Sequence, residues 1–378
     1  MSLEVTVNKR LKYLRPALRA LAAIALVLVA YLLVSPTGRY LLRAGWEEGK
    51  ILLRREPISR LVADPAAPAD LRAKLEVVLA ARAFARDSLS LSTGESFTTF
   101  SRLDRDTLVL VLSGAYRDRL KSYTWWFPIV GRVPYKGYFD FGEARRQQQN
   151  LSDRGFDARL GPASAFSTLG WFNDPLLPTT LRADSLTVAE TVIHELTHNT
   201  FYAPGGAVFN ESFANFAGSR GAEQFFRSRG GSAAADEVVA RWKDEKLLGR
   251  FWGALYDRVD SAFKARPGDE PEASAARVAA RDAIFAEARQ QLIHEVGPQL
   301  HTIGPQALER TRFDNAVLMS RRVYLTDLDA FDRVLARNGG DLRRAIAAII
   351  AAAKSDREHP FDAVKRLAQV SDTARRSP

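Results

Sequence analysis

The spacing of apolar side chains predicts a mostly helical chain that also contains a small sheet. Apolar positions recur three or four residues apart over 39–63 and 70–87, which is the pattern of an amphipathic helix. Composition shifts toward strand formers over 92–114, and TLVLVL at 107–112 is the best strand candidate. Gly, Pro and aromatic residues crowd 125–140, which we expect to be turns and extended chain. The pattern also predicts a strand or extended edge at 158–168 and helices at 143–155, 275–296, 315–324, 327–338 and 342–354.

These elements favour an α+β fold with three parts along the chain. RPGDEP at 266–271 is the clearest linker, because Gly and two Pro interrupt both helix and strand. We therefore expect a basic arm with an apolar segment at 1–38, the main domain at 39–265, and a helical C-terminal part at 272–378 packed on that domain. A chain of 378 residues can bury a core of this size.

The uncharged run ALAAIALVLVAYLLV at 20–34 follows a basic cluster and is broken by Ser35 and Pro36. Its fifteen residues would reach roughly 22 Å as a helix, short of the ~30 Å hydrocarbon core, but Arg19 and Arg39 can extend outward. The run is interpreted as a single membrane anchor or as a cleaved signal peptide. The absence of a small-x-small cleavage site after it favours the anchor. Either interpretation places the rest of the chain outside the cytoplasm.

The formal net charge of +10 is concentrated in this N-terminal arm. Residues 1–55 hold ten Lys/Arg and three Asp/Glu, a net charge of +7, so the remaining residues carry only +3. We expect no nucleic-acid partner, because the main part of the chain is nearly neutral. The sequence contains no Cys, which excludes disulfides, thiolate nucleophiles and Cys-based zinc sites. Any metal must therefore be held by nitrogen and oxygen ligands.

HELTH at 194–198 contains two of the five histidines of the chain, four residues apart. Thr187 and Glu190 fit a capping box, which predicts a helix that begins there and ends near Tyr202. On a helix, His194 and His198 would lie on one face and could bind one metal ion. Glu195 would lie beside them, where its carboxylate can contact a metal-bound water without being a ligand.

A third ligand is expected from the chain that follows this helix. APGG at 203–206 predicts a reversal, and FNESFAN at 209–215 predicts a second helix. Glu211 on the returning helix can be the third ligand, and Asn215 can hydrogen-bond the distal nitrogen of a ligand histidine. Three protein ligands with a water at the fourth position are typical of catalytic zinc sites. The other histidines, His294, His301 and His359, are expected to be surface or core residues.

This ligand set predicts peptide hydrolysis by zinc-activated water, with Glu195 taking the proton and returning it to the leaving amine. The oxyanion then needs a hydrogen-bond donor, for which Tyr202, Tyr138 and Tyr324 are the candidates. Each of these tyrosines is equally consistent with a half-buried packing role.

HELTH, FNESFANF, VPYKGYFD, AFSTLGWFNDPLL and the C-terminal block FDNAVLMSRRVYLTDLDAFDRVLARNGGD together resemble the bacterial putative aminopeptidase family, which is similar to gluzincin-type metallopeptidases. The likeness runs from about 57 to 340. It implies a zincin-like fold, with a small sheet packed on the HExxH helix and a helical C-terminal part. It also implies Zn²⁺ as the cofactor, His194, His198 and Glu211 as its ligands, and Glu195 as the catalytic glutamate. The blocks at 137–140 and 168–172 would line or support the cleft.

The chain departs from this family at two places. Many relatives resemble lipoproteins with a Cys after the apolar run, whereas this chain has Ser35-Pro36, so a protein anchor replaces the lipid. Phe166 stands where relatives tend to have Tyr, which removes one oxyanion donor. We therefore expect a peptidase anchored in the bacterial inner membrane that faces the periplasm, or a secreted one if 1–35 is cleaved.

Three functional alternatives stay open at the level of sequence. The favoured function is a zinc aminopeptidase, which needs an acidic side chain to bind the free amine of a peptide substrate. Asp140, Asp174 and Glu190 are the candidates for that group. The other functions are a zinc endopeptidase and a non-catalytic anchored scaffold or binding protein with a structural metal site.

Overall fold

The computed structural model describes residues 16, 18–24, 26–27, 29–103, 109–127, 131–162 and 175–369. The chain divides into two compact units, one of residues 1–54 and 126–131 and one of residues 55–125 and 132–378. The predicted active-site residues all belong to the second unit.

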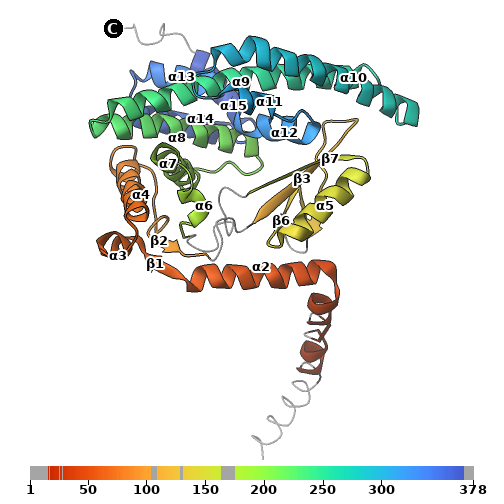
Figure 1. Cartoon of the computed structure of the whole chain (residues 1–378), viewed down its shortest axis with the longest axis horizontal. Coiled ribbons are helices and arrows are strands. Elements are labelled where there is room, and N and C mark those ends of the chain that lie inside the picture. The colour runs from red at the N-terminus through yellow and green to blue at the C-terminus, as the bar shows by residue number, and fades with distance from the viewer. Residues whose placement is uncertain are drawn as a thin grey trace, which may run out of the picture. The chain divides into compact units, whose positions relative to one another are not determined.

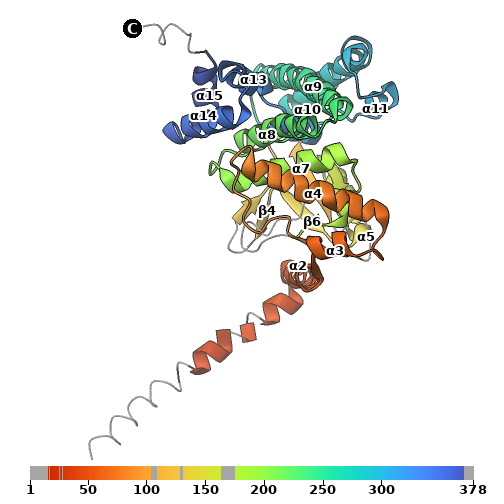
Figure 2. The ribbon, with the colours of Figure 1, turned by 90° about the vertical axis from the view of Figure 1, so that its left-hand side faces the viewer.

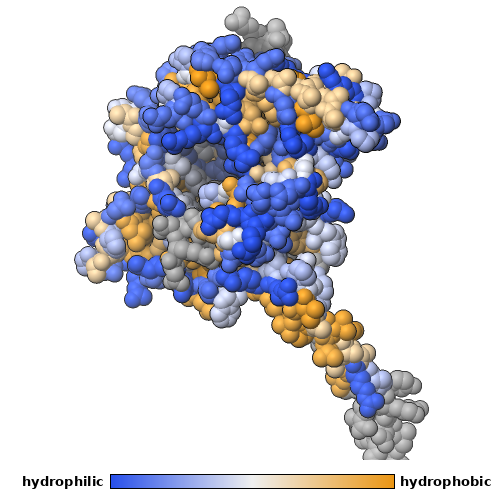
Figure 3. Space-filling model, turned by 45° about the vertical axis from the view of Figure 1, so that its right-hand side comes forward, coloured by the Kyte–Doolittle hydropathy of each residue, from blue (hydrophilic) through white to orange (hydrophobic). Residues whose placement is uncertain are grey.

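The first unit is built around helix α2 (Pro36–Leu53). Ser35 caps it by accepting the amide N–H of Gly38 at 2.8 Å, and Pro36 starts its first turn. Among the described residues, no single helix is both long and apolar enough to cross a membrane. The helices over Leu18–Val34 and Pro36–Leu53 are long and apolar enough to cross a membrane only when they are counted together. The chain bends by 89° between them. The apolar side chains of the first of these are largely exposed (Figure 3).

Four helices form the centre of the second unit: α4 (Ala69–Asp87), α7 (Ser185–Thr200), α8 (Ala207–Ser228) and α9 (Ser232–Lys264). Helix α7 packs between α4 and α8, and α8 packs on α9 (Figures 1 and 2). The C-terminal helices pack on α8, on α9 and on one another, and they are α10 (Pro271–Gln291), α11 (Pro305–Glu309), α12 (Asn315–Tyr324), α13 (Leu328–Arg337), α14 (Leu342–Ser355) and α15 (Pro360–Gln369). The shorter helices are α3 (Ile58–Ala63), α6 (Pro178–Leu181), a π-helical segment at Leu292–Val296 and a 3-10 helix at Gly297–Gln299.

The core of this unit is a cluster of aromatic rings between α8, α9 and α13. Phe213 and Phe216 of α8 stack on Phe331 of α13 with ring centroids 6.0 and 5.5 Å apart. Phe216 also lies 6.2 Å from Trp242 of α9. Each of these four side chains is less than 2% exposed, so together they bury a large apolar area that fixes α8 against its neighbours.

The main sheet has three antiparallel strands, with β3 (Leu110–Tyr116) between β6 (Tyr135–Tyr138) and β7 (Phe156–Pro162). Its main helix partners are α5 (Phe141–Asp153) and α12, whereas the HExxH helix α7 packs mainly on α4 and α8. The main contacts of the sheet are thus with α5 and with α12, which packs on α8 and α9, rather than with the HExxH helix as predicted. Two smaller pairs are β1 (Arg55–Pro57) with β2 (Thr99–Ser101) and β4 (Trp125–Phe127) with β5 (Gly131–Val133).

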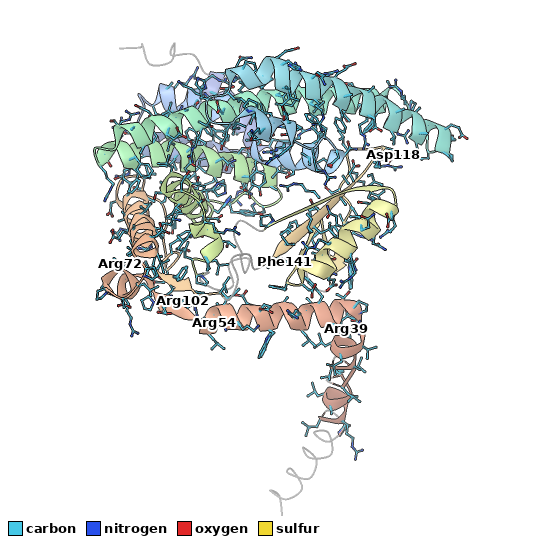
Figure 4. The ribbon with its side chains drawn as sticks, in the orientation of Figure 1. Arg39, Arg54, Arg72, Arg102, Asp118 and Phe141 are labelled. Atoms are coloured by element: carbon cyan, nitrogen blue, oxygen red, sulfur yellow. The ribbon has the colours of Figure 1, made fainter. Side chains whose placement is uncertain are left out.

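Buried polar contacts hold α10 and α12 against the end of this sheet. Asp157 of β7 accepts hydrogen bonds from the guanidinium of Arg281 at 2.7 Å and from the amide of Asn315 at 2.8 Å. Asp118, labelled in Figure 4, pairs with Arg277 at 3.2 Å, and both side chains are about nine-tenths buried. Burying an unpaired charge costs free energy, so these contacts hold the start of α12 against the sheet. Tyr324 lies at the other end of the same helix.

Several predicted elements agree with the structure and others do not. The helix predicted at 315–324 is α12, and those at 327–338 and 342–354 agree with α13 and α14 to within one residue at each end. The single helix predicted over 39–63 is wrong, because strand β1 separates α2 from α3. Pro57 has no N–H to donate and disfavours helix at the preceding residue. Residues 107–108 and 163–168 of the two predicted strands lie outside the described residues.

Candidate metal centre

Helix α7 carries the HExxH residues and begins two residues earlier than predicted. Its N-cap is Asp184, whose carboxylate accepts the amide N–H of Thr187 at 2.8 Å. The predicted capping box at Thr187 is therefore wrong, since that residue lies inside the first turn. The guanidinium of Arg241 on α9 binds the same carboxylate at 2.8 Å and lowers the pKa of Asp184 to about 2, so the cap stays charged at neutral pH.

Two histidines of α7 and one glutamate of α8 converge on one point. The Nε2 atoms of His194 and His198 are 3.1 Å apart. The Glu211 carboxylate approaches them at 3.4 and 3.7 Å, respectively. Ligand atoms of all three side chains lie within 4.8 Å of one another, and each side chain is half-buried. The structure thus brings together the three residues that the sequence predicted as ligands.

A tight turn returns the chain so that Glu211 can reach the histidines. Asn210 is 2% exposed, and its side-chain amide both accepts from the N–H of Ala203 at 2.9 Å and donates to its carbonyl at 2.8 Å. Gly205 in this turn has φ +77°, a conformation that favours glycine. Further along, Gly218 allows α8 to approach α7 closely, because a Cβ there would lie 2.9 Å from the Glu190 carbonyl and 3.2 Å from the His194 Cβ.

The protonation of this group fits a divalent cation with nitrogen and oxygen ligands. Burial and the neighbouring His194 lower the pKa of His198 to about 4, so its imidazole is neutral at pH 7. Burial opposes protonation of His194, but its hydrogen bond to Glu211 and the charge of Glu195 outweigh burial and raise its pKa. A bound cation would take the place of that proton. The donor set of two imidazoles and one carboxylate matches the preferences of zinc.

Asn215 and Glu195 lie next to the three predicted ligands. Asn215 lies one turn after Glu211 on α8, and its side chain interacts with that of His194 and helps to raise the pKa of this histidine. Its amide nitrogen also donates to the backbone carbonyl of Tyr324 at 2.9 Å. Asn215 thus links a ligand histidine to the end of α12. Glu195 follows His194 on α7 and interacts electrostatically with both His194 and Tyr324.

Of the three candidate tyrosines, only Tyr324 faces the ligands. Tyr324 is 44% exposed, but the buried part of its ring and the charges of Glu211 and Glu195 raise its pKa to about 12, so its phenol remains a hydrogen-bond donor at neutral pH. Tyr202 is 59% exposed in the loop after α7. Tyr138 is 3% exposed in the apolar cluster between the main sheet and α5, where it has a packing role.

Two buried carboxylates lie beside the ligands. Glu190 is one turn before His194 on α7, and its side chain interacts with that of Ser219 on α8. Burial and the charge of Glu245 raise its pKa to about 8. Glu245 of α9 interacts electrostatically with His194, and burial raises its pKa to about 7. The sequence singled out Glu190 but not Glu245, because no motif marks α9.

Taken together, these residues define a candidate metal centre of the kind found in metal-dependent hydrolases. The sequence model of the putative aminopeptidase family matches residues 39–364, and the chain belongs to this family. Neither the comparison with curated proteins nor that with solved structures gives a match.

Proposed function

We propose that this chain is a zinc-dependent aminopeptidase in which Glu195 activates the hydrolytic water. The observation that carries the proposal is the convergence of His194, His198 and Glu211 with Glu195 beside them. A structural zinc site would use a fourth protein ligand, whereas the cluster found among the described residues contains three. Membership of the putative aminopeptidase family supports the same reaction class.

The metal would be held by the two Nε2 atoms of His194 and His198 and by the carboxylate of Glu211. When bound, zinc lowers the pKa of a water molecule and polarises the scissile carbonyl. Asn215 interacts with His194 and would restrain its ring, so that the ligand nitrogen stays directed at the site. Glu211 is held by the turn that Asn210 closes.

Glu195 would transfer the proton, and Tyr324 would stabilise the negative charge that develops on the substrate oxygen. The carboxylate of Glu195 accepts a proton from the attacking water and passes it to the leaving amine. Tyr324 donates its phenolic hydrogen to the substrate carbonyl oxygen as that oxygen gains negative charge. Its raised pKa keeps this hydrogen in place at neutral pH.

An aminopeptidase also needs a negative group for the free amine of its substrate. Asp140 accepts the amide N–H of Glu143 at 2.7 Å and caps α5, so its carboxylate already has a structural partner. Asp174 lies outside the described residues. Burial raises the pKa of both Glu190 and Glu245, which interact with each other, so a nearby substrate ammonium would stabilise the charged form of these carboxylates. We therefore assign amine binding to this pair.

Glu195→Gln tests the proposal, because it keeps the size of the side chain and removes the base. The variant should retain zinc, measured by metal analysis of the purified protein, and lose about 10²–10⁴-fold in the rate of peptide hydrolysis. Glu272→Gln, on the exposed start of α10, is the matched control and should behave as wild type. Zinc-loaded Glu195→Gln with an unchanged rate would refute the role of Glu195.

The N-terminal segment suggests the cellular setting of this activity. Its apolar run supports a tether to the bacterial inner membrane, with the peptidase part in the periplasm. Peptides would then be the substrates that reach the site from the periplasmic side. Fractionation of membranes from expressing cells, followed by protease protection, tests this placement, and recovery of the chain in the cytosol would refute it.

A further inference from the structure

A cavity of about 530 Å³ lies among α9, α12, α13 and α15. Its lining contains six Lys or Arg side chains and three Asp side chains, a net charge of +3, and we call it the basic pocket. The volume is within the ~300–1,000 Å³ range of small-molecule sites. The nearly neutral charge of residues 56–378 makes this local excess notable.

Three of the six cations already have acidic partners. Lys365 pairs with Asp327 at 2.7 Å, and both Lys246 and Arg250 pair with Asp329, at 3.3 and 2.8 Å. The acidic partners in these pairs are two of the three aspartates of the pocket, and the third aspartate is Asp257.

The other three cations, Arg321, Arg322 and Arg333, have no carboxylate at ion-pairing distance in the part of the chain that the structure describes. Glu245 interacts electrostatically with Arg321, and Asp257 also lines the pocket. The cations still outnumber the carboxylates, and a bound anion would lower the repulsion between the guanidinium groups.

Two of these arginines are held by aromatic rings of α9. Arg322 lies 3.8 Å from the ring centroid of Tyr256, and Arg321 lies 5.9 Å from that of Trp252. Stacking restrains a guanidinium and leaves its N–H edge available for oxygen atoms in the same plane. Burial and the nearby charge of Arg159 lower the pKa of Arg321, and the charge of Glu245 opposes this shift.

We propose that the basic pocket binds a small, multiply charged oxyanion, either a phosphate group or clustered carboxylates. Guanidinium groups bind both in a bidentate manner, and the net charge of +3 of the pocket lining matches an anion of charge −2 or −3. The phosphate could be free in solution or part of a lipid headgroup. This binding does not depend on the metal centre, although Arg321 lies one turn before Tyr324 on α12 and so places the pocket beside the proposed active site.

Isothermal titration calorimetry of the full-length chain in non-ionic detergent tests the proposal, with pyrophosphate and citrate as probes at constant ionic strength. We expect saturable binding of one anion per chain. Arg322→Gln/Arg333→Gln should weaken it at least 10-fold, whereas Arg343→Gln, exposed on α14 outside the pocket, should not. Tyr256→Leu keeps every charge and removes the ring under Arg322, so it should weaken binding to a smaller extent.

Vesicle flotation then separates the two sources of phosphate. Retention on phosphatidic acid vesicles that is lost in Arg322→Gln/Arg333→Gln supports a lipid headgroup, and anion binding without such retention supports a free anion. Absence of saturable binding to every probe overturns the proposal. Equal affinity of wild type and the double variant, with both proteins folded by circular dichroism, overturns it as well.

Discussion

At the scale of single residues, the candidate site is a double row of polar side chains on two facing helices. Glu190, His194 and His198 are four residues apart on α7, and they face Ser219, Asn215 and Glu211 on α8. Glu190 interacts with Ser219 and His194 interacts with Asn215, and the Glu211 carboxylate approaches both histidines. The row therefore extends one turn beyond the metal ligands, which gives substrate groups a polar surface next to the metal.

Tyr324→Phe should reduce kcat about 10²–10³-fold with little change in zinc content, because it removes one oxyanion donor and keeps the ring. Steady-state kinetics on a short peptide measures this effect. Tyr202→Phe is the control, since Tyr202 is 59% exposed. If Tyr202→Phe lost activity and Tyr324→Phe did not, Tyr202 would be the oxyanion donor instead of Tyr324.

Glu245 predicts how stability depends on pH in the metal-free protein. Its folded pKa of about 7 exceeds its ordinary value of 4.5 because of burial, despite the charges of His194, Arg241 and Arg321. The folded state therefore holds the proton more tightly than the unfolded state, and stability falls as pH rises from about 4.5 to 7. Glu245→Gln should remove this loss and stabilise the protein at pH 8 by about 1–3 kcal/mol, with no gain at pH 4.

Denaturant unfolding in the presence of a chelator, at pH 4 and pH 8, measures this difference. Glu272→Gln removes an exposed carboxylate and serves as the control. An equal stability of wild type and Glu245→Gln at pH 8 would show that Glu245 is not buried in the way described.

The sequence could predict the part of the site that is local in the chain. His194, Glu195, His198, Glu211 and Asn215 lie within 22 consecutive residues, where helical spacing and one reversal decide their proximity. The rest of the site comes from distant elements. Glu245 on α9, Arg321 on α12 and Arg159 on β7 reach it only through tertiary packing. No local pattern could identify them.

At the scale of elements, the α7–α8 pair positions the ligands. Gly218 is the point of closest approach, since a Cβ there would lie 2.9 Å from the Glu190 carbonyl and 3.2 Å from the His194 Cβ. The backbone carbonyl cannot move without disturbing α7, so the spacing of this helix pair and the direction of His194 depend on a glycine at 218.

Gly218→Ala should therefore destabilise the protein by about 1–3 kcal/mol and weaken zinc binding. Gly253→Ala is the matched control in another helix, because a Cβ at 253 meets no atom within 4 Å. Replacement of a helical glycine at such a position is expected to stabilise by about 0.5–1 kcal/mol. Thermal unfolding and zinc titration of both variants measure the contrast, and the same response in both would refute close packing at Gly218.

Two of the helices that the sequence predicted well have their own start signals. Asp314 caps α12 and Asp341 caps α14 by accepting an amide N–H three residues on, which marks each helix in the local sequence. Helix α9 was not predicted. It begins after two glycines without a side-chain cap, so no local signal marks its start, although its buried side chains recur every three or four residues. Its buried face includes Trp242 and Phe251, which pack on elements far away in sequence.

At the scale of the whole molecule, a metal ion would join α7 and α8 at the centre of the second unit. Ligands that bind only the folded state stabilise it by mass action, by about 2.7 kcal/mol at 100 times Kd. Zinc should thus raise the Tm of the wild-type chain, by roughly 2–4 °C for each kcal/mol. His198→Ala should lose this response. Scanning fluorimetry with zinc and with chelator measures it, and an equal rise in both proteins would place zinc elsewhere.

The architecture was predictable in outline only. A mostly helical chain with a small sheet follows from apolar spacing, and the structure agrees. The packing of the sheet on α12 does not follow from the sequence, because it depends on Asp157, Arg281 and Asn315, which are brought together from β7, α10 and α12. Such buried polar contacts have no periodic signature in a sequence.

The central claim is a metal-dependent aminopeptidase, and one comparison of rates tests it most directly. Zinc-loaded wild-type protein is given the same short peptide with a free amine and with an acetylated amine, and release of the first residue or of internal fragments is followed by mass spectrometry. We predict cleavage of the free peptide alone, from its amino end, and loss of that cleavage on zinc removal or in Glu195→Gln. Equal cleavage of both peptides would show an endopeptidase, and no cleavage of either with zinc bound would contradict the catalytic role of the site.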